Sequence, residues 1–329
     1  MPHLEPPRQP FFGAPRLADD GDNRSAFAFI GLPVGSPYDA DGIRSPSRGG
    51  ADHVRAMSYE QECQDEADHY DFDLDGPLMP SGTRPSLIDY GDVVTDVRDL
   101  EAGKRFATGV VRSALEGGAL PFVIGGDHSI SPIVARAYEA FGSFNLLHVD
   151  AHLDFRDEVG GVRDGYSSPV RRIREMPWFR SVVQVGLRGV GSARSQEVRE
   201  AQEAGNTIIK ADDLHDRGVP WVLEQMPWDV PWYVTIDVDG LDPTIAPGTG
   251  YPLPGGLTYR QIAALVRAVA SRGMLAGMDV AETHPEDDLR GLTALTILRL
   301  LVLAMGCSVR ASGREDSVLP LRLTTTRPD

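Results

Sequence analysis

The strongest indication of the fold lies in the middle of the chain, in Phe144-Asn-Leu-Leu-His-Val-Asp-Ala-His-Leu-Asp154. The segment begins with a short, mainly apolar run, and acids and histidines follow at once. An apolar run of this length is typical of a strand that is buried on both faces of a parallel sheet. We therefore expect a buried strand whose carboxyl end carries polar side chains.

Similar runs recur along the chain and alternate with helical patterns. The other apolar runs are Ala26–Gly31, Leu120–Ile124, Ser181–Val185, Thr207–Ile209, Trp232–Ile236 and Met274–Val280. The helical patterns are Leu100–Glu116, Pro132–Phe141, Ala193–Glu203, Tyr259–Ala270 and Thr293–Ala304. This alternation predicts an α/β fold with a parallel sheet covered by helices on both faces.

The chain of 329 residues fits one large α/β domain. We expect residues 1–24 to form a flexible or surface-draped N-terminal arm and residues 25–329 to form a single catalytic domain. The first third, to about Asp92, is richer in Gly, Pro and polar residues, so we expect it to contribute loops. The apolar segment Leu292–Met305 is interrupted by Arg299 and is too short for a bilayer, which predicts a core helix.

Composition excludes several classes of protein. The formal net charge is -16, whereas a nucleic-acid binder normally carries a basic face. The two cysteines, Cys63 and Cys307, are far apart, which excludes a disulfide framework and favours a reducing compartment. The N-terminus lacks the apolar stretch of a signal peptide or membrane anchor. We therefore expect a cytoplasmic protein that binds neither nucleic acid nor membrane.

Polar motifs follow four of the predicted strands. Gly125–Ser129 follows the run that ends at Ile124, and Asp150–Asp154 follows the run quoted first. Asp237–Asp242 and Glu282 follow two later runs. Ligand sites of open α/β sheets lie outside the carboxyl ends of the strands. These acids and histidines are therefore expected to meet at one edge of the sheet.

The residue types at this edge indicate a metal site. Side chains two apart in extended backbone share a side, so the spacing of Asp150, His152 and Asp154 brings three ligand groups together. The full set is His128, Asp150, His152, Asp154, Asp237 and Asp239. Four buried carboxylates need compensating charge, which two divalent cations supply. Carboxylate-rich ligation without thiolates favours Mn²⁺ or Mg²⁺, and the histidines favour Mn²⁺.

Each motif alone has a plainer interpretation. Asp237–Asp242 alone is compatible with an aspartate-rich turn or a calcium loop. Gly-Gly-Asp-His-Ser129 alone is compatible with an anion-binding backbone nest. Their occurrence together, at successive strand ends, favours the metal site.

At these residues the chain resembles the ureohydrolase family, which includes arginase and agmatinase. The resemblance rests on Gly125-Gly-Asp-His-Ser129, on Asp150-Ala-His-Leu-Asp154 and on Thr235-Ile-Asp-Val-Asp-Gly-Leu-Asp-Pro-Thr-Ile-Ala-Pro-Gly-Thr-Gly250. It implies a three-layer α/β/α sandwich, two Mn²⁺ per subunit and a small guanidino substrate. It also implies a homo-oligomer, either a trimer or a hexamer.

The resemblance also implies a role for each site residue. One metal would be held by His128, Asp150, Asp154 and Asp237, and the other by Asp150, His152, Asp237 and Asp239. Asp154 would also accept a hydrogen bond from the metal-bridging hydroxide. Glu282, in Met278-Asp-Val-Ala-Glu-Thr-His-Pro285, would grip the guanidinium. His284 is compatible with substrate contact and equally with an ordinary loop histidine. Gly31-Leu-Pro33 and Gly42–Gly50 resemble the agmatinase branch and would shape the entrance.

One position departs from the family pattern. Agmatinases usually carry a His-Gly pair between the second motif and a segment like Ser168–Arg172, and the aligned pair here is Asp164-Gly165. Asp164 would then replace the usual proton-carrying histidine, which puts the usual substrates in doubt. The predicted activity is hydrolysis of a guanidino compound to urea and an amine. The alternatives are a formimino or amidine hydrolase of the same fold and a weakly catalytic metal-binding homologue.

Overall fold

The computed structural model describes residues 1–17, 23–36, 38, 46–60, 68–95, 99–190 and 192–320. Within these residues nine strands form one sheet in the order β1-β3-β2-β4-β9-β8-β5-β6-β7. The strands are His3–Glu5 (β1), Phe27–Leu32 (β2), Leu87–Val94 (β3), Leu120–Gly125 (β4), Phe144–Val149 (β5), Phe179–Leu187 (β6), Thr207–Lys210 (β7), Trp232–Asp237 (β8) and Leu275–Ala281 (β9). Neighbouring strands of β2 to β9 pair in parallel, and β1 pairs antiparallel with β3.

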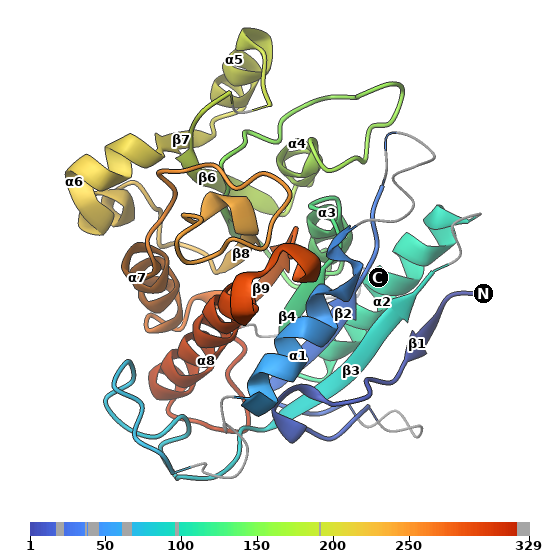
Figure 1. Ribbon diagram of the computed structural model, residues 1–329, viewed down its shortest axis with the longest axis vertical. Helices are drawn as coiled ribbons and strands as arrows, with labels where there is room; N and C mark the ends of the chain where they lie inside the picture. The colour runs from blue at the N-terminus through green and yellow to red at the C-terminus, as the bar shows by residue number, and fades with distance from the viewer. Residues whose placement is uncertain are drawn as a thin grey trace, which may run out of the picture.

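Helices cover both faces of the sheet (Figure 1). They are Gly50–Glu60 (α1), Leu100–Glu116 (α2), Ile130–Arg136 (α3), Pro169–Arg174 (α4), Ser195–Glu203 (α5), Ala211–Glu224 (α6), Tyr259–Ala270 (α7) and Leu292–Ser312 (α8). In β2, Phe27 and Phe29 belong to a core with α1, α7 and α8, whereas Ala28 and Ile30 belong to a core with α2 and α3. This alternation is the period of two expected of a strand buried on both faces. The predicted three-layer sandwich is confirmed.

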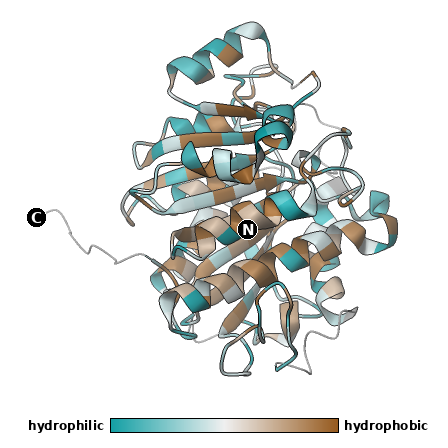
Figure 2. Ribbon diagram, turned by 90° about the vertical axis from the view of Figure 1, so that its left-hand side faces the viewer, coloured by the Kyte–Doolittle hydropathy of each residue, from teal (hydrophilic) through white to brown (hydrophobic). Residues whose placement is uncertain are grey.

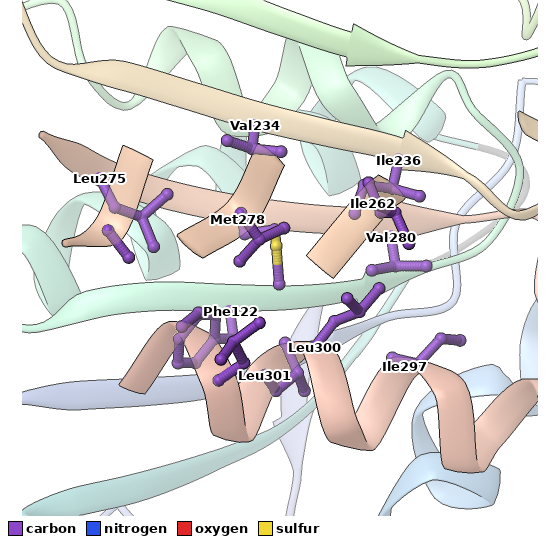
Figure 3. Close-up of a cluster of buried hydrophobic side chains, with 14 of the residues drawn as sticks. Phe122, Val234, Ile236, Ile262, Leu275, Met278, Val280, Ile297, Leu300 and Leu301 are labelled. Carbon is purple, nitrogen blue, oxygen red and sulfur yellow. The ribbon is translucent and has the colours of Figure 1, made fainter. Parts of the chain in front are cut away.

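The core beneath α8 shows how these layers hold together. Figure 3 shows Phe122, Met278 and Val280 of the sheet facing Leu300 and Leu301 of α8. Each of these side chains is at most 1% exposed, and burying one of this size contributes about 1.5–3 kcal/mol. In Figure 2 the strands are coloured mainly as apolar residues, and many of the polar residues lie on the outer helices.

Local sequence signals fix the ends of the best-predicted helices. Asp99 caps α2 by accepting a hydrogen bond from the backbone N–H of Ala102. Thr258 and Gln261 form a capping box at the start of α7. Both helices have the bounds that the sequence predicts, because a cap and an apolar stripe within one short segment determine them.

The first third does contribute loops, such as residues 77–86, but it also contains α1 and β3, which the sequence analysis did not predict. The strand was missed because Asp89 and Asp92 interrupt its apolar pattern. Arg55 of α1 forms ion pairs with both acids, with Nε 2.9 Å from Asp89 Oδ2 and Nη1 2.7 Å from Asp92 Oδ1. A buried ion pair between residues so far apart in the sequence leaves no local signal.

Residues 1–17, which belong to the expected flexible or surface-draped arm, pack against the edge of the sheet. Strand β1 pairs with β3, Phe11 is fully buried, and Phe11 stacks on Phe29 with ring centroids 4.4 Å apart. The backbone N–H of Phe11 also donates a hydrogen bond to Asp89 at 2.7 Å. The buried rings of Phe11 and Phe12 anchor this segment, although its Pro-rich composition indicated a flexible one.

Helix α8 is a core helix, as predicted, but it is longer than the predicted segment. The helical segment Leu289–Ser312 is long and apolar enough to cross a membrane by length and composition, and 83% of its apolar window is buried inside the protein. The argument from shortness was therefore wrong, whereas burial supports the core assignment.

Some expectations fall on residues that the structure does not describe. Residues 42–45 of the expected entrance segment and Cys63 lie outside the described residues. Cys307 is buried in α8, as expected of a small apolar side chain.

Candidate metal centre

The predicted site residues follow four strands that are neighbours in the sheet. The strands β4, β9, β8 and β5 stand side by side in that order. His128 follows β4, Glu282 follows β9, Asp237 ends β8 and Asp150 follows β5. The carboxyl ends of parallel strands share one edge, so the sheet order brings these side chains together.

His128 lies at the centre of a cluster of three carboxylates. Its Nδ1 is 3.1 Å from Asp150 Oδ2, 3.2 Å from Asp154 Oδ2 and 3.1 Å from Asp237 Oδ2. All four side chains are almost fully buried. One imidazole nitrogen can donate a hydrogen bond to only one of these oxygens at a time. The nitrogen and the three oxygens are therefore arranged as metal ligands are, around a common point.

A second cluster shares Asp150 with the first. His152 Nδ1 is 3.0 Å from Asp239 Oδ2 and 3.4 Å from Asp150 Oδ1. The structure therefore brings all six predicted ligands into two adjoining groups. The ligand atoms of Asp150, His152 and Asp239 all lie within 4.8 Å of one another.

The segment after β5 is not the extended backbone that the spacing suggested. It bends at Ala151 and His152, and Asp154 has a φ of 51°. The carboxylate of Asp150 accepts a hydrogen bond from the backbone N–H of His152 at 2.6 Å, which closes a tight turn. Because of this turn, Asp154 joins the cluster around His128, and His152 joins the cluster with Asp239. A continuous strand would have placed both side chains on the same face.

Two glycines allow the loops around this cluster to approach closely. A Cβ at Gly240 would lie 2.7 Å from the backbone nitrogen of Asp150, so the loop after β8 packs directly on the loop after β5. A Cβ at Gly126 would lie 1.8 Å from the carbonyl oxygen of Val34. Close packing therefore requires glycine at Gly126. Its φ is not positive, so the backbone conformation is not the reason for glycine here.

The carboxylates of the cluster repel one another in a buried site. Burial, followed by the charge of Asp150, raises the pKa of Asp154 to about 7 and that of Asp239 to about 6. Burial, followed by the charge of Asp239, raises the pKa of Asp237 well above its ordinary value. Burial alone would raise the pKa of Asp150, but the neighbouring histidines lower it well below that value. Divalent cations would relieve this repulsion.

Unpaired polar atoms at the same point support the fit of a cation. His128 Nδ1 and Asp150 Oδ2 are buried and complete no hydrogen bond. Buried polar atoms without a partner are rare in native proteins. Carboxylates with imidazoles and no thiolate form a donor set that suits Mn²⁺. The residues present therefore fit divalent cations.

The other ring nitrogen of His128 is held by a buried hydroxyl network. His128 Nε2 is 3.0 Å from Thr235 Oγ1, and Thr235 donates a hydrogen bond to Asp279 at 2.6 Å. Ser131 and Tyr233 also donate to Asp279. Burial raises the pKa of Asp279 to about 7. The network fixes the ring of His128 so that Nδ1 faces the carboxylates.

Glu282 lies beside the cluster. Its Oε1 accepts a hydrogen bond from the backbone N–H of His128 at 3.1 Å, and its Oε2 lies 3.3 Å from Ser47 Oγ and from His284 Nε2. Its φ of 60° is unusual for a residue without glycine's freedom. Such strain persists where the surroundings hold the residue, and it clusters at functional sites. His284 is thus a partner of Glu282.

Asp164 has a different neighbour. Its Oδ2 lies 3.3 Å from Nζ of Lys104 on α2, which also pairs with Glu101. Among the described residues, Asp164 forms no ion pair or hydrogen bond with any of the six predicted ligands. Its predicted part in proton transfer therefore stays a prediction.

The sequence interpretation missed His148. This residue of β5 is fully buried, and its Nε2 is 3.0 Å from Asp150 Oδ2. Burial lowers its pKa, which favours the neutral ring. Its position two residues before Asp150 in an expected strand was the available signal, because side chains two apart share a face.

A mostly parallel α/β sandwich with a cluster of acids and histidines at its strand ends defines an arginase-like protein with a candidate metal centre. Residues 26–307 match the arginase family. The chain therefore belongs to the arginase family, and the resemblance to ureohydrolases is confirmed.

Individual relatives agree with this family assignment. The N(1)-aminopropylagmatine ureohydrolase of Thermus thermophilus is 36% identical over 195 residues, which cover 58% of this chain and 64% of the relative. The chain thus spans just under two thirds of the length of that relative. The agmatinase of Photorhabdus laumondii is 30% identical over 299 residues, which cover 84% of this chain and 91% of that protein.

A solved structure supports the fold. The proclavaminate amidino hydrolase from Streptomyces clavuligerus superposes with a TM-score of 0.73 and is 27% identical. The match covers 92% of this chain and 97% of that chain. The sandwich and its connections are therefore those of the arginase family over nearly the whole length.

Proposed function

We propose that this chain is an amidinohydrolase that cleaves a guanidino compound to urea and an amine with two Mn²⁺ per subunit. The observation that carries the proposal is the approach of three carboxylates to His128 Nδ1 within 3.2 Å, with Glu282 hydrogen-bonded to the backbone of the same histidine. A cation-binding cluster and an acid that suits a planar cation thus lie side by side.

We assign the ligands as the family resemblance implies. His128, Asp150, Asp154 and Asp237 would hold one cation, and Asp150, His152, Asp237 and Asp239 the other. The contact of His152 with Asp239 supports the second set, and the carboxylates around His128 support the first. Oxygen-rich ligation with two imidazoles favours Mn²⁺ over Mg²⁺.

The side chains around the cluster have distinct tasks in this mechanism. When bound, the two cations supply an acidified water and Lewis acidity for the attack on the guanidinium carbon. The carboxylate of Glu282 pairs with the planar guanidinium and fixes its orientation. The Asp154 carboxylate accepts a proton from the attacking water and returns it to the leaving amine. The backbone N–H of His128 keeps Glu282 in position.

We also propose a soluble cytoplasmic enzyme that forms a homo-oligomer, either a trimer or a hexamer, and takes a small guanidino substrate. The family membership supports the substrate class. Light scattering at several protein concentrations measures the oligomeric state, and a monomer throughout would contradict this part of the proposal.

A urea-release screen with added Mn²⁺ tests the activity. The panel is agmatine, N(1)-aminopropylagmatine, 4-guanidinobutyrate, arginine and larger guanidino metabolites. Urea release from one of them is the expected result. Release of formamide from a formimino compound, without urea from any guanidino compound, would favour the alternative amidine hydrolase. Tight Mn²⁺ binding without either product would favour the weakly catalytic homologue.

The proposed part of Asp164 in proton transfer needs its own experiment. If Asp164 carries a proton, Asp164→Asn lowers kcat and changes its pH profile. If the carboxylate acts only through its ion pair with Lys104, Lys104→Met has the same effect as Asp164→Asn. Equal kcat and equal pH profiles in the two variants would therefore contradict proton transfer by Asp164.

A further inference from the structure

A series of contacts between buried polar side chains leads from Asn206 to Asp150. Asn206 Nδ2 donates a hydrogen bond to Gln184 Oε1 at 3.0 Å. Gln184 Nε2 lies 3.2 Å from His148 Nδ1, and His148 Nε2 lies 3.0 Å from Asp150 Oδ2. Gln184, His148 and Asp150 are 0% exposed, and Asn206 is 8% exposed. These residues come from β5, β6 and the segment just before β7, which are neighbours in the sheet.

The partners of Gln184 determine which way its amide points. Its Nε2 donates a hydrogen bond to the carbonyl oxygen of Leu153 at 2.8 Å. A carbonyl can only accept, so the NH₂ group must face Leu153, and the same NH₂ group faces His148. The amide of Asn206 meets the opposite atom, Oε1, which agrees with this orientation.

The orientation of Gln184 in turn determines the tautomer of His148. The NH₂ group of Gln184 is a donor, so His148 Nδ1 must accept and carries no proton. The neutral ring then holds its proton on Nε2, which faces Asp150 Oδ2 at 3.0 Å. These two buried atoms are in close contact but complete no hydrogen bond, so the interaction between them is electrostatic.

We propose that His148 is a positioning residue for Asp150 and not a metal ligand. The ligand atoms of His148 lie within 4.8 Å of those of His128, Asp150 and Asp154, so distance alone would admit it as a fourth ligand. A protonated Nε2 has no lone pair for a cation, and this excludes it from the ligand set. Instead the N–H lies 3.0 Å from Asp150 Oδ2, and its partial positive charge favours this orientation of the carboxylate without a completed hydrogen bond.

The orientation of Asp150 is decisive because this carboxylate touches both groups of the cluster. Its Oδ2 lies 3.1 Å from His128 Nδ1, and its Oδ1 lies 3.4 Å from His152 Nδ1. The inference rests on the proposed function in one respect, namely that these two groups hold cations. A rotation of Asp150 would then disturb both cation sites at once.

Nuclear magnetic resonance on the unaltered protein tests the tautomer. The protein is labelled with ¹⁵N-histidine, and His148→Phe assigns the ring signals of His148. We expect an unprotonated Nδ1 and a protonated Nε2, both before and after the addition of Zn²⁺, a diamagnetic cation. Loss of the Nε2 proton on adding Zn²⁺, with the shift of a metal-bound nitrogen, would overturn the proposal. So would a protonated Nδ1 in the free protein.

Metal affinity tests the positioning role. His148→Phe keeps an aromatic ring that can stack on His128, whose ring centroid is 5.2 Å away, but it removes the N–H. Gln184→Glu replaces the donor with an acceptor and draws the proton to Nδ1. Because outer partners of ligands typically change metal affinity by roughly 10- to 100-fold, both variants should bind Mn²⁺ at least tenfold more weakly. Affinities within twofold of the unaltered protein in both variants would overturn the proposal.

A matched control and a rescue variant complete the experiment. Gln225→Glu makes the same chemical change on an exposed residue that follows α6, and it should leave the Mn²⁺ affinity within twofold. His148→Gln keeps an amide donor and should restore part of the affinity that His148→Phe loses; no difference between these two variants would count against the donor role. The readouts are binding and proton positions, so absence of urea release would contradict the proposed function while leaving this inference intact.

Discussion

The Oε1 oxygen of Glu282 accepts a hydrogen bond from the backbone N–H of His128 at 3.1 Å, across 154 positions of the sequence. This contact joins the end of β9 to the loop after β4, its neighbour in the sheet. It places the acid proposed to bind the guanidinium directly beside the proposed metal ligands.

Replacing Glu282 with Gln should separate substrate binding from metal binding. Glu282→Gln removes the charge that pairs with the guanidinium, and a hydrogen bond to a charged group contributes about 1.5–3 kcal/mol. We expect kcat/KM for urea release to fall roughly 10- to 100-fold, which is that free energy expressed as a rate ratio. The Mn²⁺ affinity should fall by less than kcat/KM does, because Glu282 contacts the backbone N–H of His128 and not its ring.

Glu286→Gln is the control for this variant, because Glu286 is exposed in the nearby turn Pro285–Asp287. It should leave both quantities unchanged. A Glu282→Gln enzyme with undiminished kcat/KM would refute the proposed role of Glu282.

Replacing Asp237 with Asn should remove metal binding together with activity. Asp237 is proposed to serve both cations, and its Oδ2 lies 3.1 Å from His128 Nδ1. Loss of a ligand should weaken Mn²⁺ binding by more than about 100-fold, beyond the range found for outer partners. Isothermal titration of Mn²⁺ into the variant measures this, with the exposed Asp216→Asn of α6 as a control.

Removing the metal should lower the thermal stability. A ligand at about 100 times its Kd stabilises the folded state by about 2.7 kcal/mol. At about 2 °C per kcal/mol, Mn²⁺ should raise the Tm by roughly 5 °C over protein treated with a chelator. The same addition should leave the Tm of Asp150→Asn unchanged. An equal shift in both proteins would show that the cation binds elsewhere.

The stability of α8 should depend on pH through Asp288. This carboxylate accepts hydrogen bonds from the backbone N–H groups of Thr293 and Ala294, and it lies 2.9 Å from His53 Nε2. Burial alone would raise the pKa of Asp288, but these donors lower it below its ordinary value of 3.8. A lowered pKa means that the stabilisation is present above 3.8 and is lost as the pH falls through the folded-state pKa.

Asp288→Asn should therefore lower the free energy of unfolding by about 1 kcal/mol at pH 7, the size expected for a charge at a helix N-terminus. The difference from the unaltered protein should shrink as the pH falls below about 4. Urea unfolding at several pH values measures it, and Asp216→Asn should differ by less than about 0.5 kcal/mol throughout. A difference that is constant with pH would contradict the assigned cause.

Much of the site could be predicted because its residues stand directly after apolar runs. Asp150 and Asp237 each follow or end such a run, and the parallel arrangement sends both to one edge of the sheet. By contrast, the positive φ of Asp154 and the turn that Asp150 closes with His152 depend on backbone contacts that no spacing rule contains.

The features that the sequence analysis missed have a different physical origin from those that it predicted. Strand β3 was overlooked because Asp89 is buried only when Arg55 accompanies it. The N-terminal segment was expected to be loose because only the docked structure shows Phe11 stacked on Phe29. Both depend on pairs that are distant in the sequence.

The sequence by itself determined seven of the nine described strands, five of the eight described α-helices, the acids and histidines at the strand ends and the membership in the arginase family. These follow from patterns within a few residues, where apolar period and side-chain chemistry suffice. Only the tertiary structure decided that Asp164 faces Lys104, that Glu282 is held by the backbone of His128 and that Gln184 sets the tautomer of His148. Each of these is a contact between segments far apart in the chain, and such contacts exist only once the sheet has brought the strands together.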